Sequence, residues 1–351
     1  MDSYYQIATQ PKLYVSYPLW QYASGALDAI SVDGADITDE QLIKLLQLDP
    51  AKFMQVDIQG NVNIAMDYKI VPNSDNFTNV IEQGLWNYDF FAILGHNLHT
   101  SGLIPSIEAL NDQNSINLAM SQLVNYVPNS IPDYDGWSLM SITDKPDQDY
   151  RTFRLNLNSL NGVTFNKLKL GSIMWGKAFE FPVNANLSET FSIDYGVTQK
   201  ETITGKTISN LNWSKLNNWI TEPWGLTNSE EGDNFQRRSG RRKWKLQFDS
   251  LAPEKVMNQL MMMNSNGWNA KDNHAVYGVD NKSQYNINNA IDFYSNCVHK
   301  SLGGHLPMML QVDKDDFSPQ GFALVRMKSN YQIVQKTPNL YNISIELEEQ
   351  I

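Results

Sequence analysis

Residues 151–157 read Arg-Thr-Phe-Arg-Leu-Asn-Leu, and every second side chain from Phe153 onward is apolar. Phe153, Leu155 and Leu157 therefore fall on one face of an extended chain, while polar side chains fall on the other. The same alternation occurs at Val62, Ile64 and Met66, and in segments 191–195, 244–248 and 343–347. This series predicts a mainly β protein whose strands each bury one face.

Other local patterns complete the expected order of elements. Segments 86–94 and 168–175 are apolar enough to predict buried strands. Thr38, with Gln41 three residues later, predicts a capping box that begins a helix ending before Asp49-Pro50. Apolar residues at helical spacing predict another helix over 116–127, and a third is expected at about 253–263. Segment 128–146 is rich in Asn, Asp, Gly and Pro, which predicts a loop.

The length of 351 residues suits two domains. Pro182 and the polar stretch that follows it mark the best boundary, so we expect domains over 1–182 and 183–351. The expected architecture is two β-sandwich or jelly-roll-type domains with a few short helices. The first thirty residues are aromatic and irregular, and they would either dock on another surface or pack into their own domain.

Composition limits the classes of partner. The net charge is −11, so general binding to a phosphate backbone is disfavoured. Charged residues make up only 19% of the chain, and the remaining polarity comes from uncharged side chains. Uncharged amides are less costly to desolvate than ions, which suits a protein that packs against neighbours. We expect no secretory signal and no membrane insertion, because no apolar run approaches the length of a membrane span.

The sequence contains few candidates for catalytic or metal-binding residues. Cys297 is the single cysteine, which excludes an intrachain disulfide, and we expect a half-buried thiol on a strand with His299. His96 and His99 lack a zinc-binding pattern, and the aspartate clusters at 133–135, 144–149 and 313–316 lack the EF-hand order. Glu222, between two tryptophans, is the one candidate for a glycosidase carboxylate, without an identifiable second acid. The sequence therefore predicts no catalytic set, no metal and no cofactor.

A basic cluster at 237–245 stands out in this acidic chain. It runs into the alternating strand of Trp244, Leu246 and Phe248, which places Arg241, Lys243 and Lys245 on the opposite face. It could be a contact with a neighbouring acidic subunit, a solvated hairpin, or a phosphate clamp. The subunit contact is the favoured interpretation, and its residues would be Arg238, Arg241, Arg242 and Trp244.

Trp213, Trp219 and Trp224 lie close together in a polar region. Exposed indoles stack on sugars and also anchor protein interfaces, so these residues are candidates for contact with a glycan or a protein partner.

Two parts of the chain resemble tail proteins of tailed bacteriophages. Segment 90–98, Phe-Phe-Ala-Ile-Leu-Gly-His-Asn-Leu, followed by Thr100-Ser-Gly102, looks like the strand and turn of a discoidin-like (galactose-binding-like) jelly roll. Its next matching elements are 150–155 and 170–182, where Leu-Gly-x-x-x-x-Gly-x-Ala-x-x-x-Pro occurs. The second half is similar to distal-tail-type proteins through three segments: 239–244 with its Gly-Arg-Arg-x-Trp, 304–308 with the acidic residues after it, and 340–348.

This resemblance implies a virion structural protein, assembled in the host cytoplasm, at the distal end of a tail or in its baseplate. Such proteins form rings of identical copies, often hexamers, that join the tail tube to hub, fibre or receptor-binding proteins. The jelly roll would contact other tail parts or host glycans. Neither enzymatic activity nor nucleic-acid binding is expected. The alternatives are a carbohydrate-binding or receptor-binding tail module, and a glycan-degrading tail enzyme that uses Glu222.

Overall fold

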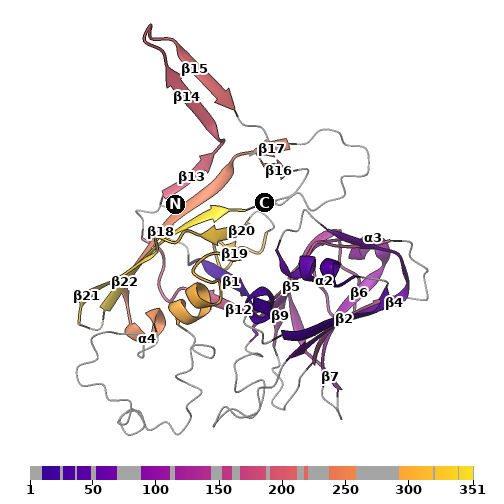
Figure 1. Ribbon diagram of the computed structural model, residues 1–351. Coiled ribbons are helices and arrows are strands. Elements are labelled where there is room, and N and C mark those ends of the chain that lie inside the picture. The colour runs from indigo at the N-terminus through magenta and orange to yellow at the C-terminus, as the bar shows by residue number, and fades with distance from the viewer. Residues whose placement is uncertain are drawn as a thin grey trace, which may run out of the picture.

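The computed structural model describes residues 10–23, 27–35, 38–48, 53–68, 88–110, 115–143, 152–159, 167–186, 190–211, 217–219, 237–257, 292–318, 321–338 and 340–350. They form a mainly β protein of antiparallel sheets with a few short helices, which confirms the predicted fold class (Figure 1). The helices are α1 (Pro18–Ala23), α2 (Asp39–Leu46), α3 (Leu98–Ser101), α4 (Pro253–Val256) and the π-helix η4 (Tyr294–His299).

The strands of the first half are β1 (Lys12–Ser16), β2 (Leu27–Ala35), β3 (Met54–Val56), β4 (Ile58–Tyr68), β5 (Phe90–His96), β6 (Leu103–Leu110), β7 (Ser115–Asn117), β8 (Met120–Val124), β9 (Gly136–Ile142), β10 (Thr152–Ser159), β11 (Leu168–Leu170) and β12 (Ser172–Glu180). Those of the second half are β13 (Thr190–Asp194), β14 (Val197–Glu201), β15 (Thr207–Leu211), β16 (Asn217–Trp219), β17 (Arg237–Ser239), β18 (Arg241–Leu251), β19 (Met308–Gln311), β20 (Phe322–Met327), β21 (Gln332–Thr337) and β22 (Leu340–Glu349).

Two sheets of the first half face each other across a shared core. One is a five-stranded sheet in the order β2-β4-β10-β6-β7, and the other contains β12, β5, β9 and β8. Along β10, Phe153, Leu155 and Leu157 are fully buried, as the alternation predicts. The Phe153 ring lies 5.4 Å from Trp175 of β12 and 5.8 Å from Phe91 of β5, measured between ring centroids. The two sheets therefore form a sandwich with an aromatic centre.

The larger sheet has eleven strands, and it curls so that β20 approaches β9 around a second core. Ten of the strands follow the order β13-β18-β22-β20-β19-β1-β12-β5-β9-β8, and β21 pairs with β22 beside this path. Four strands separate β20 from β9, so a flat sheet would hold them about 24 Å apart. Nevertheless the rings of Phe322 (β20) and Trp137 (β9) lie 5.1 Å apart. This curvature explains why β5 is buried on both faces.

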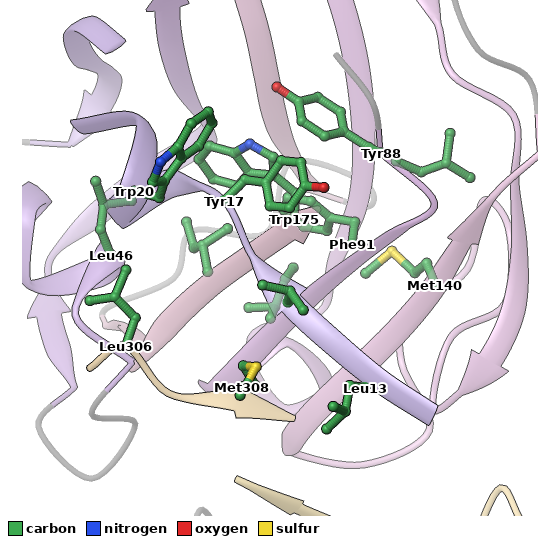
Figure 2. Close-up of a cluster of buried hydrophobic side chains, with 14 of the residues drawn as sticks. Leu13, Tyr17, Trp20, Leu46, Tyr88, Phe91, Met140, Trp175, Leu306 and Met308 are labelled. Carbon is green, nitrogen blue, oxygen red and sulfur yellow. The ribbon is translucent and has the colours of Figure 1, made fainter. Parts of the chain in front are cut away.

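The N-terminal strand joins the two halves of this sheet. β1 pairs antiparallel with β12 on one side and with β19 on the other. Leu13, Tyr17 and Trp20 are buried in the cluster shown in Figure 2. Of the two roles considered for the first thirty residues, the described part, from residue 10 onward, packs into its own chain.

The boundary expected near residue 182 stays a prediction. Strands from both sides of it belong to one sheet, since β1 lies between β12 and β19. Side chains from both sides also share one apolar cluster, in which Phe181 stacks on Phe248 at 3.8 Å. The two halves are therefore joined by a continuous core.

The capped helix is confirmed as α2. The Thr38 hydroxyl accepts a hydrogen bond from the Gln41 backbone N–H at 3.4 Å, and Gln41 Oε1 accepts one from the Thr38 N–H at 2.9 Å. The helix predicted over 116–127 is wrong, because β7 and β8 occupy this segment. Pairing with β6 and β9 overrides its helical spacing of apolar residues.

Three further expectations need correction. The predicted loop 128–146 contains β9, which is almost entirely buried. The helix expected at 253–263 begins at Pro253 but ends at Met257, whose backbone is extended, and residues 258–263 lie outside the described part. Cys297 and His299 lie in the π-helix η4 and not in a strand, and the thiol is fully buried instead of half-buried.

Candidate interaction surface

A two-stranded hairpin projects from the body of the molecule. β14 and β15 pair only with each other, from Val197↔Leu211 to Glu201↔Thr207. In Figure 1 this hairpin, which we call the arm, extends beyond the sheet and away from the rest of the described chain. Every residue of β14 and all of β15 except Leu211 are exposed. The arm therefore has solvent on both faces.

The arm and the strand before it carry many exposed apolar side chains. Fourteen large hydrophobic residues are exposed in the described part of the chain, and six of them lie within 190–211: Phe191, Ile193, Tyr195, Val197, Ile203 and Ile208. A two-stranded hairpin alone is marginally stable in water. Concentrated exposed apolar surface usually marks an interaction site. The segment from β13 to the apex of the arm thus concentrates the exposed apolar side chains, as a surface that becomes covered would.

The tip of the arm is held in a defined turn. The Thr202 hydroxyl donates to the Lys206 carbonyl at 3.0 Å and accepts from the Lys206 N–H at 3.1 Å. The Gly205 N–H donates to the Thr202 carbonyl, and Gly205 has φ +80°, a value that favours glycine. Between them Ile203 has a relative exposure of 108%, so its side chain meets no protein surface. The turn therefore presents an apolar side chain at its apex.

At the base of the arm, β13 forms the end of the large sheet and pairs with β18. Phe191 lies opposite Trp244, with ring centroids 5.8 Å apart, and Ile193 lies opposite Arg242. Trp244 is buried, but Phe191 and Ile193 remain 55% and 45% exposed. A Cβ at Gly240 would come within 2.6 Å of the Ile193 methyl group, so a glycine lets these strands approach. The apolar face that Trp244 buries in the core thus extends onto β13, where Phe191 and Ile193 are exposed to solvent.

The structure places the four predicted interface residues at this base. Arg241 and Arg242 begin β18 and are half-buried, and Trp244 is buried beneath Phe191. Arg238 lies in β17, but its side chain is outside the described part. Contact with another subunit stays a prediction for all four.

Arg242 has strong partners within its own chain. Its Nη2 and Nε donate to Glu349 Oε1 at 2.8 and 3.1 Å, and its backbone N–H donates to Glu349 Oε2 at 3.0 Å. Nη2 also donates to the Phe322 carbonyl at 3.0 Å, and the guanidinium lies 5.2 Å from the Trp244 ring centroid. The Glu349 side chain is only 1% exposed. Arg242 therefore neutralises a buried carboxylate at the C-terminal end of β22.

The outer face of β18 is an ion-pair ladder and not a purely basic stripe. Lys243 Nζ lies 2.7 Å from Asp194 and 3.5 Å from Glu348, and Lys245 lies 3.8 Å from Glu346. The hydrogen bond from Lys243 lowers the pKa of the Asp194 carboxyl and raises that of the lysine. The predicted alternation is confirmed, since Trp244, Leu246 and Phe248 are buried and Lys245 is exposed. The basic cluster in the sequence therefore overstates the positive charge of this surface, because the acidic partners of its lysines come from distant segments of the chain.

The other predicted contact residues lie mostly outside the described part of the chain. This applies to Trp213, Trp224 and Glu222, while Trp219 is placed in β16 by its backbone alone. A glycan site at these residues therefore stays a prediction.

The histidines near the end of β5 hold the local turn. His96 is buried, its Nε2 lies 2.9 Å from the Ser138 hydroxyl, and burial lowers its pKa to about 3. His99 Nδ1 lies 2.8 Å from the Pro132 carbonyl oxygen. Within the described residues, no three His, Cys, Asp or Glu side chains gather as a metal site. Burial also raises the Cys297 pKa well above its ordinary value, so this thiol stays protonated.

A cavity of about 330 Å³ opens beside the end of β12. Its lining is partly aromatic, from Phe179 and Phe181, and partly charged, from Lys177, Glu180 and Lys255. Glu180 accepts a hydrogen bond from Lys314 at 3.1 Å. The remaining lining residues are Gln10, Ala178, Pro182 and Asn296.

Sequence reasoning did not find the arm. Its strands contain few apolar residues, and only the alternation at 191–195 marked the region. The signal that could have located it is Thr204-Gly205 between two short polar strands with several β-branched residues, which is typical of a hairpin turn.

Comparison with known proteins assigns this chain to no family. No family model matches the chain, and no curated protein matches it. Among solved structures, one similar chain is described as CpGH89CBM32-6 produced by Clostridium perfringens. The two are 15% identical with a TM-score of 0.28, over 43% of this chain and 94% of that one. In the described residues, no helix is both long and apolar enough to cross a membrane.

Proposed function

We propose that this protein is a non-enzymatic structural component that acts by binding other protein subunits, including copies of itself. The observation that supports this most is the arm, a hairpin exposed on both faces with an isoleucine at its apex. Such a segment gains its stability when a partner covers it. When the arm of one copy contacts a different surface of the next copy, repetition of that contact builds a ring or a filament.

The sequence resemblance supports a more specific assignment. We propose a distal-tail or baseplate ring protein of a phage tail, which joins the tail tube to hub, fibre or receptor-binding proteins. The low charged fraction of 19% and the ion pairs satisfied within the chain agree with a surface that packs against neighbours. Its place of action would be the virion.

The experiment is a measurement of mass by light scattering at low and moderate salt, with electron microscopy of the same sample. We expect a discrete ring-sized species many times the 40.0 kDa chain mass. Ile208, which is 57% exposed on one face of the arm, provides the variant Ile208→Asp, and Asn210→Asp on that face is the matched control. Ile208→Asp should weaken assembly because it places a charge in a covered apolar contact.

A different result would favour the alternative of a carbohydrate-binding tail module. If the protein is monomeric in every condition and binds specific glycans on an array, recognition of a sugar would replace assembly as its function. Variants of Trp219 would then locate the binding residues.

A further inference from the structure

We propose that β15 in the arm of one copy pairs antiparallel with the open edge of β13 in a second copy, so that the large sheet of one copy continues into the arm of the other. This inference rests on the proposed self-assembly and names the two strands that meet. Across the contact, Ile193 lies opposite Thr207 and Asp194 lies opposite Lys206 of the arm.

Both strands have an edge that no described strand covers. Within the described part of the chain, β13 pairs only with β18, and β15 pairs only with β14. All of β13 is exposed, as is all of β15 except Leu211. An open edge presents a row of backbone N–H and C=O groups, which is a template for a strand from another chain.

These two edges also lack the features that usually block such pairing, which are charged side chains, bulges and short length. Among the other described edges, β14 carries Lys200 and Glu201, while β2, β8 and β21 contain register shifts. The strands β3, β7, β11, β16 and β17 have three residues each. By contrast, β13 and β15 are regular and five residues long, and Asp194 is the one charged residue in them. They are therefore the best matched edges in the described part of the chain.

The hydrogen bonds of the sheet show which residues of β13 point to its open edge. Lys245 of β18 lies opposite Glu346, whose carbonyl accepts a hydrogen bond from the far side of β22. Lys245 therefore points away from β22 and bonds to Thr190 of β13. Because the direction alternates along a strand, Phe191 and Ile193 turn their backbone N–H and C=O groups to the open edge.

The turn of the arm gives the same information for β15. The Thr202 N–H donates to the Lys206 carbonyl, so these residues form a hydrogen-bonded pair that continues the register of the hairpin. The next pair, at Thr207, is then not hydrogen-bonded within the arm. Thr207 and Ser209 therefore turn their backbone groups to the open edge of β15.

One antiparallel register joins these groups over the whole of β13. It aligns β13 with 206–210 of the arm, so that the outward-facing residues of the two strands meet and exchange N–H···O bonds in both directions. Ile193 then meets Thr207, a β-branched pair of the kind that stabilises sheets. Asp194, whose side chain is 50% exposed, meets Lys206, which places opposite charges at the end of the pairing.

The contact joins different copies. In Figure 1 the arm extends beyond β13 and away from the sheet, and β15 does not pair with β13 of its own chain. The donated strand and the accepting edge are distinct surfaces, so the contact is heterologous and repeats from one copy to the next.

Reversing the charge of Lys206 tests this register. The turn uses only the backbone of Lys206, so Lys206→Glu keeps the turn and places a carboxylate opposite Asp194. It should weaken assembly roughly three- to tenfold. Lys200→Glu is the matched control, because Lys200 lies on β14, one strand further from the join, and should have a smaller effect. Equal effects of the two variants would overturn the pairing.

Disulfide trapping detects the strand pairing itself. We would mix chains carrying Thr190→Cys with chains carrying Asn210→Cys under oxidised glutathione, with light scattering in parallel. These positions form a pair that is not hydrogen-bonded, whose Cα atoms are about 4.5 Å apart, within the range of a disulfide. Thr190→Cys mixed with Thr198→Cys is the control, since Thr198 lies opposite Asn210 on β14 and thus about 10 Å from residue 190. The native Cys297 is fully buried and will not react in the folded chain.

The two readouts separate failure of this contact from failure of assembly. A disulfide-linked dimer from the first mixture but not from the control supports the proposal. Assembly without that dimer overturns this strand pairing alone, whereas a protein that stays monomeric and gives no dimer overturns both the pairing and self-assembly.

Discussion

Replacing Arg242 with methionine removes the two side-chain hydrogen bonds that its guanidinium donates to Glu349. The carboxylate is 1% exposed, so it would remain buried with the backbone N–H of residue 242 as its remaining described donor. Each hydrogen bond to a charged group contributes about 1.5–3 kcal/mol. Breaking a buried ion pair by removing one partner costs about 3–5 kcal/mol. The Arg242 side chain is 16% exposed, so solvent screening places the expected loss near the lower end, about 3 kcal/mol.

Urea unfolding, followed by tryptophan fluorescence and circular dichroism, would measure this loss in the free energy of unfolding. The double variant Arg242→Met with Glu349→Leu removes both charges and should recover most of it. Lys245→Met is the matched control, since Lys245 is 52% exposed, lies 3.8 Å from Glu346, and should change stability by less than about 1 kcal/mol.

The same experiment distinguishes a contact within the chain from one between subunits. An ion pair within the chain predicts a loss that does not depend on protein concentration. If Arg242→Met lost no more stability than Lys245→Met, the structural role argued for the pair would be refuted. If the loss appeared only at concentrations at which the protein assembles, Arg242 would belong to an interface instead.

Three further predictions concern the fold. Gly176→Ala should lower the melting temperature by several degrees, because the added Cβ would overlap the Val15 carbonyl oxygen where β1 joins the sheet. An unchanged melting temperature in calorimetry would contradict this. Burial lowers the pKa of Lys300 from 10.5 to about 7. The unfolded chain therefore binds more protons between these values, and stability should rise with pH by up to about 1.4 kcal/mol per unit. Lys300→Met should reduce that slope between pH 7 and about pH 8.5 in urea titrations. An unchanged slope would contradict the lowered pKa of Lys300. Thr38→Ala should lower the free energy of unfolding by about 1 kcal/mol, because it removes the capping box, whereas Thr38→Ser should keep most of that stability. Equal losses for the two variants in denaturant unfolding would contradict a stabilising role of the cap.

Features set by local periodicity could be predicted from the sequence. The alternation in β10 and β18 follows directly from the burial of one strand face, and the cap of α2 needs only Thr38 and Gln41. By contrast, segment 116–127 has apolar residues at helical spacing, and its strands form only because β6 and β9 supply hydrogen-bonding partners. Such pairing depends on distant residues and leaves no local pattern.

The candidate surface was only partly predictable for a similar reason. The sequence located the basic strand, but not the acidic residues 194, 348 and 349 that compensate its charges, since these are brought together by folding. The curl that brings β20 close to β9 and the docking of β1 between the halves also depend on long-range contacts. The strands of the arm are mostly polar because both of their faces are exposed to solvent. They therefore lack the alternation of apolar and polar residues that marks a strand with one buried face.

The central claim is that the chain assembles through its arm, and sedimentation velocity of an arm-shortened chain tests it most directly. Residues 198–210 would be replaced by Asn-Gly, which closes the hairpin between Val197 and Leu211 with a two-residue turn. We predict that the complete chain sediments as one discrete oligomer, while the shortened chain sediments as a 40 kDa-class monomer with unchanged circular dichroism and melting. A shortened chain that forms the same oligomer, or a complete chain that stays monomeric at every concentration, would contradict the account.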